Sequence, residues 1–142
     1  MIDPPAEIRP PVAQSAGQPS VAGAPGASSA ALEFALGAAR LMRDSRVEDV
    51  VVIDLRGRSS LADFFVVGTG TSQRQMSAVL EHVARLARER GERPLNVSDS
   101  SSGTWLLADY VDVVVHLFDA EHRAYYDLDG LWGEAPRILV PD

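Results

Sequence analysis

The chain of 142 residues contains no cysteine, and all thirteen of its basic residues are arginine. Without cysteine it can form neither a disulfide framework nor a cysteine-ligated metal site, which fits a cytosolic protein without requiring one. The chain also lacks an apolar run of about eighteen residues, and its N-terminus lacks a basic region followed by an apolar one. These absences argue against a membrane span and a secretory signal. The length predicts one domain with a single hydrophobic core.

Positive charge is scarce in the C-terminal part of the chain. Residues 28–94 carry ten arginines and nine acidic residues, whereas residues 95–142 carry two arginines and nine acidic residues. Such an acidic segment opposes docking onto bare phosphate backbone, so we expect little direct nucleic-acid contact. Charge complementarity indicates a basic partner surface, while solubility alone is the simpler explanation of the same charge.

Residues 1–27 lack any periodic pattern of apolar residues and contain six prolines, six alanines and three glycines. Such a segment cannot bury enough apolar surface to offset the entropy lost on ordering. We therefore predict a disordered Pro/Ala-rich tail over residues 1–27 and a folded domain over residues 28–142.

Helical and strand patterns are mixed along the folded part. A first helix is expected to begin at Ser28 or Ser29 and carries two apolar stripes, which indicate packing against the sheet and a second surface. That second surface could belong to another copy of the chain, giving a homodimer. A second helix is expected between the capping box of Ser72 and Gln75 and a stop at Gly91. The other patterns predict strands at 50–55, 63–67, 95–98, 105–108 and 113–118, and a last helix from Asp119 to Leu128. This order predicts an α/β domain with a mixed sheet of about five strands flanked by helices.

The strongest strand pattern lies in residues 105–118. Two runs of β-branched and aromatic residues, 105–108 and 113–118, are separated by four residues that begin and end with aspartate. They are predicted to be antiparallel neighbours joined by a tight connection. Three successive valines, residues 113–115, leave no polar face, so the second run should lie near the sheet centre with both sides covered.

Two patterns bear on enzymatic chemistry. Gly68–Ser72 leads from a strand into a helix N-terminus, where backbone amides can bind an anion or phosphate. It is neither a Walker P-loop nor a full Rossmann fingerprint, and a tight turn with a helix cap is the favoured interpretation. A metal-dependent nucleotidyltransferase also needs two carboxylates on one face of a strand, but Asp109 and Asp112 are three residues apart across a turn. We therefore predict no catalytic residue, no cofactor and no metal ligand, and keep a nucleotide-binding enzyme that uses the Gly68–Ser72 turn as the alternative.

Three segments of the chain, in register, resemble the ribosomal silencing factor (Iojap-like) family. They are residues 63–72, residues 105–116 and residues 126–132, and the resemblance covers residues 31–132. It implies a non-enzymatic cytoplasmic repressor of translation that binds the large ribosomal subunit through large-subunit ribosomal protein fourteen. Bound there, it blocks joining of the small subunit when nutrients run short. It also implies a fold related to nucleotidyltransferases without their catalytic carboxylates.

The chain departs from the family pattern at two places. Ser98 and Asp99 stand where the family usually has Glu-Gly, and Val111 stands where it often has Gly. The valine makes the turn after Tyr110 less free to adopt a positive φ.

The resemblance, combined with the aromatic and acidic character of the stretch, assigns a partner-binding site to five residues. Trp105 and Tyr110 are the predicted aromatic anchors, Leu106 or Leu107 the apolar support, and Asp109 the partner of an Arg or Lys. Strand alternation puts Trp105, Leu107 and Asp109 on one face and Leu106 and Tyr110 on the other. They can project together only if the strand ends or twists at Asp109. As an anchor, Trp105 is expected to be exposed in the free protein, and a core position is the alternative.

Overall fold

The computed structural model describes residues 25–99 and 103–141. Its elements, in chain order, are α1 (Pro25–Asp44), β1 (Glu48–Asp54), β2 (Phe64–Thr69), α2 (Gln73–Glu89), β3 (Asn96–Asp99), β4 (Trp105–Asp109), β5 (Val113–Phe118), α3 (Ala120–Tyr126), α4 (Leu128–Leu131) and β6 (Arg137–Ile138).

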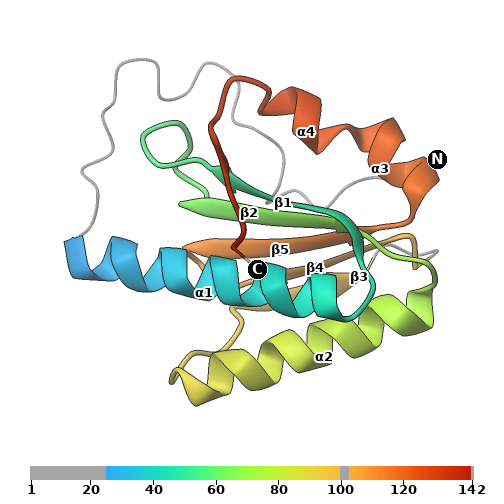
Figure 1. Ribbon diagram of the computed structural model, residues 1–142, viewed down its shortest axis with the longest axis horizontal. Helices are drawn as coiled ribbons and strands as arrows, with labels where there is room; N and C mark the ends of the chain where they lie inside the picture. The colour runs from blue at the N-terminus through green and yellow to red at the C-terminus, as the bar shows by residue number, and fades with distance from the viewer. Residues whose placement is uncertain (1–24, 100–102, 142) are drawn as a thin grey trace.

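These strands form one mixed sheet in the order β3-β4-β5-β2-β1-β6 (Figure 1). β2 and β5 run parallel, and all other neighbours in the sheet are antiparallel. The predicted α/β fold with a mixed sheet is confirmed. The sequence pattern missed β6, because a strand of two residues is too short to show alternation.

Helices lie on both faces of the sheet. α1 and α2 pack on one face, and α3 and α4 lie over the other (Figure 1). Each face has its own apolar cluster, the first shared with α1 and α2 and the second with α3, α4 and the segment that follows. This two-sided burial explains why β2 and β5 are buried at every position and show no polar alternation.

Helix α1 begins at Pro25, before the predicted start at Ser28 or Ser29. Proline is accepted in the first turn of a helix, where the amide that it lacks would have no helical partner. α1 packs against both the sheet and α2, so α2 is the second surface that the two apolar stripes required. Of the predicted disordered tail, residues 1–24 lie outside the described residues.

Both ends of α2 are built as predicted. The Ser72 hydroxyl accepts a hydrogen bond from the Gln75 amide at 3.0 Å, and the Gln75 side-chain oxygen accepts from the Thr71 amide at 2.8 Å. At the C-terminus, Gly91 has φ +77°, and the Glu92 amide donates to the Ala87 carbonyl at 2.8 Å. This is a Schellman ending, and its left-handed position favours glycine.

The hairpin of β4 and β5 closes through a strained turn. The Asp112 amide donates to the Tyr110 carbonyl at 2.9 Å across Val111, whose φ is +75°. This is the geometry of a γ-turn in its rarer, left-handed form. The Asp109 carboxylate accepts from the Val111 amide at 2.8 Å and holds the turn from its N-terminal side. Val111 therefore adopts the positive φ that its β-branched side chain disfavours.

Replacing Val111 by glycine should accordingly stabilise the protein, although it removes a side chain. The Val111 side chain is mostly exposed, so little burial is lost. We expect the free energy of unfolding to rise by about 0.5–1 kcal/mol, because relief of left-handed strain outweighs the extra entropy of glycine in the unfolded chain. Urea denaturation of Val111→Gly beside Val111→Ala measures this effect. A glycine variant less stable than the alanine variant would contradict it.

The last helix ends earlier than predicted. α3 stops at Tyr126 because Asp127 takes a left-handed conformation with φ +50°, and α4 starts anew at Leu128. The Asp127 carboxylate accepts from the Gly130 amide at 3.0 Å, so one aspartate ends α3 and caps α4. The prediction of one helix through Leu128 is therefore wrong, because the chain turns at Asp127 between α3 and α4.

Candidate functional site

The structure places the five predicted partner-binding residues on two opposite faces of the sheet. Trp105 and Leu107 belong to the cluster under α3 and α4, whereas Leu106 and Tyr110 belong to the cluster under α1 and α2. Strand alternation is regular through β4, as its pairing with β5 shows. These side chains therefore do not form one surface.

Trp105 is 2% exposed, and the expectation of an exposed anchor is wrong for it. Its ring centroid lies 4.5 Å from those of both Phe118 and Tyr126, within an aromatic cluster. Its indole N–H donates to Nδ1 of His116 at 3.3 Å. Complete burial lowers the pKa of His116 to about 3, so this imidazole is neutral at pH 7. Trp105 is part of the core in the free protein, and a binding measurement on folded Trp105 variants is the test of its predicted anchor role.

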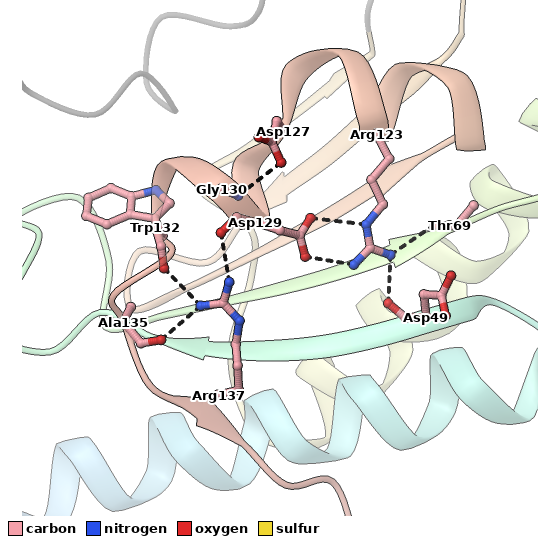
Figure 2. Close-up of polar contacts among 9 residues, drawn as sticks. All are labelled: Asp49, Thr69, Arg123, Asp127, Asp129, Gly130, Trp132, Ala135 and Arg137. Atoms are coloured by element: carbon pink, nitrogen blue, oxygen red, sulfur yellow. Dashed lines mark hydrogen bonds and ion pairs between the residues drawn. The ribbon is translucent and has the colours of Figure 1, made fainter.

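Two arginines, Arg123 and Arg137, fasten α3, α4 and the segment that follows them (Figure 2). Arg123 on α3 makes a bidentate ion pair with Asp129 on α4, at 3.2 and 2.9 Å. The same guanidinium donates to the Asp49 carbonyl of β1 and to the Thr69 hydroxyl of β2, at 2.6 and 2.9 Å. Arg137 donates to the carbonyl oxygen of Asp129 in α4 and to those of Trp132 and Ala135 in the segment between α4 and β6. We call residues 120–135, with these anchors, the C-terminal cap.

The opposite side of β4 borders an open groove between α2 and the β3–β4 hairpin. It has a volume of about 410 Å³. Its lining comes from three elements: Ser77, Leu80, Glu81 and Ala84 of α2, Val97, Ser98 and Asp99 of β3, and Leu106, Ala108 and Tyr110 at β4. We call it the α2–β3 groove. Both of its charged lining residues are acidic.

Leu106 and Tyr110 form the floor of this groove and are themselves largely buried. Tyr110 is 4% exposed, and its ring packs edge-on against Phe34 of α1 with centroids 5.0 Å apart. Burial raises the pKa of the Tyr110 phenol, so it stays neutral well above pH 7. Tyr110 is therefore not an exposed side chain in the free protein, but it lines an open groove, and its contribution to binding stays a prediction.

Asp109 lies at the end of β4 and is half-buried. Its carboxylate oxygen Oδ1 already accepts the Val111 amide in the turn. The structure therefore gives Asp109 a local role in addition to the predicted role as a charged partner.

The Gly68–Ser72 turn is filled by the chain's own groups. A Cβ at Gly68 would meet Val47 at 2.4 Å, and one at Gly70 would meet Met76 at 2.2 Å, so both glycines permit close packing. The Thr71 and Gln75 amides are occupied by the side chains that cap α2. This geometry is that of the predicted turn and helix cap.

Residues 25–99 and 103–141 contain neither a candidate metal cluster nor a helix suited to span a membrane. No group of three or more His, Asp or Glu side chains in this part of the chain could hold a metal ion. Among the same residues no helix has the length and apolar character needed to cross a membrane.

Comparisons with known proteins agree on a single family. Residues 28–142 match the family described as "Ribosomal silencing factor during starvation". The ribosomal silencing factor of Halalkalibacterium halodurans is 38% identical over 95 residues, which cover 67% of this chain and 81% of that protein. A crystal structure of a Chromobacterium violaceum protein superposes with a TM-score of 0.65 at 32% identity, over 74% of this chain and 85% of that chain. A mouse protein named "Mitochondrial assembly of ribosomal large subunit protein 1" is 28% identical over 95 residues, 65% of this chain and 42% of that protein.

The fold and the groove define a small α/β domain with a buried aromatic face on one side and an acid-lined apolar groove on the other. The matching family supplies the biological setting. The chain belongs to the ribosomal silencing factor family, and its role is ribosome-associated silencing.

Proposed function

We propose that this protein represses translation by binding the large ribosomal subunit through large-subunit ribosomal protein fourteen, and that it sterically blocks joining of the small subunit under nutrient limitation. It acts as a binding module in the cytoplasm, where ribosomes are present, and not as an enzyme. The observation that carries the proposal is the family match over residues 28–142.

The distribution of charge supports a ribosomal protein as the direct contact. Residues 95–142, with two arginines against nine acidic residues, supply β3 and β4 of the α2–β3 groove. Such a surface is repelled by rRNA phosphates and attracted by the basic side chains of a ribosomal protein. The name of the mouse relative, which refers to assembly of the large ribosomal subunit, also supports the choice of subunit.

The enzyme alternative gains no support from the Gly68–Ser72 turn. A phosphate would have to compete there with the Ser72 and Gln75 side chains for the amides at the start of α2. We therefore place the function in the binding surfaces of the domain.

Sedimentation with purified ribosomal subunits tests the proposal. We expect the full chain to pellet with large subunits and to stay in the supernatant with small ones. Added before mixing, it should lower the yield of joined ribosomes in a subunit-joining assay. Equal binding to both subunits, or binding to large subunits without any effect on joining, would contradict the proposal.

A further inference from the structure

The outer edge of β3 carries exposed apolar side chains beside the α2–β3 groove. β3 is an edge strand, paired on one side with β4. Leu95, just before it, is 71% exposed, and Val97 within it is 58% exposed. Proteins usually protect sheet edges with charges, bulges or a covering segment, because unpaired strand edges attract other strands. Apolar side chains at such an edge indicate a surface that is covered by a partner.

Strand register directs Val97 and Asp99 into the groove. Val97 pairs with Ala108 and Asp99 pairs with Leu106, so both β3 residues share a face with two groove-lining residues of β4. Leu95 immediately precedes β3 and adds exposed apolar surface beside this edge, outside the groove lining. An added strand at this edge would therefore find main-chain hydrogen-bond partners along β3, with the apolar α2–β3 groove next to it.

Charge limits what can occupy this groove. The charged residues that line it are Glu81 of α2 and Asp99 of β3, both exposed at its margin. The side-chain Nε2 of Gln73 donates to the Asp99 carboxylate at 3.1 Å and holds that carboxylate beside the groove. A second copy of the acidic β3–β4 region would bring like charges together, whereas a basic segment would meet opposite charge.

We infer that the α2–β3 groove and the edge of β3 receive an extended basic segment of the ribosomal partner. The segment adds to the sheet as a strand beside β3. Main-chain hydrogen bonds to β3 supply affinity, and alternate side chains supply specificity. Apolar side chains of the segment pack on Val97 and Tyr110, and its Arg or Lys side chains face Glu81 and Asp99. This inference rests on the proposed function, because the partner is taken to be the ribosomal protein that this chain binds.

A charge placed in the groove tests the inference directly. Val97→Asp should weaken binding to purified large subunits by about tenfold or more, as truncation of a central contact does. Leu139→Asp is the matched control, because Leu139 is 87% exposed and lies beyond β6, on the opposite edge of the sheet. It should bind within about twofold of the unaltered protein. Thermal melts of both variants establish that each is folded.

Hydrogen exchange provides a second measurement that does not depend on a substitution. On binding of large subunits, the amides of residues 95–99 should exchange more slowly, whereas those of β6 should be unchanged. Asp99→Asn combined with Glu81→Gln should also reduce the dependence of affinity on salt concentration.

The outcomes separate this inference from the proposed function. Unaltered protein that fails to bind large subunits contradicts the proposed function. The groove inference alone is overturned if the unaltered protein and Val97→Asp bind large subunits equally well and the amides of residues 95–99 do not exchange more slowly on binding. The free protein could instead form a homodimer that Val97→Asp dissociates while binding to large subunits is unchanged. That result would identify a second copy of the chain as the occupant of the groove and would also overturn the inference.

Discussion

Replacing Trp105 by alanine is expected to lower the free energy of unfolding by about 3–5 kcal/mol, the range for removal of a large aromatic side chain from a core. The ring packs against Phe118 and Tyr126, and its N–H is the hydrogen-bond donor to buried His116. Truncation therefore leaves a cavity beneath the C-terminal cap and a buried imidazole nitrogen without its partner. Urea denaturation at pH 7 measures the change. A loss below about 1 kcal/mol would contradict the buried position of the ring.

Trp105→Phe is the matched control, since it keeps an aromatic ring and removes the indole donor. Its loss of stability should be smaller, about 1–3 kcal/mol, from the unsatisfied nitrogen of His116 and the smaller ring. The two variants also separate packing from binding, because Trp105 faces away from the α2–β3 groove. Under conditions where both variants remain folded, we expect them to bind large subunits like the unaltered protein. A folded Trp105 variant that loses binding would restore the anchor role predicted from the sequence.

Local patterns were sufficient to predict most of the fold. The β4–β5 pairing follows from two apolar runs around a short turn, and the buried centre follows from the successive valines of β5. The ends of α2 follow from Ser72 and Gly91, because capping is chemistry between residues close in sequence. In contrast, the bend at Asp127 depends on an aspartate in the left-handed backbone conformation, which a periodic pattern of apolar residues does not predict.

The candidate site was harder to predict, because exposure depends on what covers each face. Alternation correctly separated Trp105 from Leu106, but the sequence does not show that α3 and α4 fold back over the first of these faces. The exposed residues Leu95 and Val97 were missed because the polar/apolar alternation of a short strand looks the same whether its apolar face is covered or exposed. The signal that could have found them is the brevity of β3 between Pro94 and a serine-rich loop, which is typical of an edge.

Arg123→Ala tests what holds the C-terminal cap over the aromatic face, and we expect it to lower the free energy of unfolding by about 2–3 kcal/mol. The substitution removes four hydrogen bonds, two to Asp129 and one each to Asp49 and Thr69 (Figure 2). It also leaves the partly buried Asp129 carboxylate without its cation. The estimate lies below the range for a fully buried pair, because water reaches part of that carboxylate. Arg123→Lys keeps the positive charge but lacks the planar guanidinium that forms two parallel hydrogen bonds. It should therefore recover only part of the lost free energy of unfolding.

The pH dependence distinguishes a lost ion pair from lost packing at the same position. Burial alone would raise the pKa of Asp129, but hydrogen bonds and charge from Arg123 hold it below its ordinary value of 3.8. In the unaltered protein this pair therefore contributes its full stability above about pH 3.8, and the contribution disappears as the pH falls through the lower folded-state pKa. In Arg123→Ala the Asp129 carboxylate has lost its ion-pair partner, and it stops lowering the free energy of unfolding once it is protonated. Because burial raises the pKa of Asp129 once Arg123 is gone, the difference in unfolding free energy between the two proteins should be largest near pH 7 and should already shrink as the pH falls towards 3.8. A difference that stays constant down to low pH would assign the effect of Arg123 to packing of its side chain, and the ion pair would not be what fastens the cap.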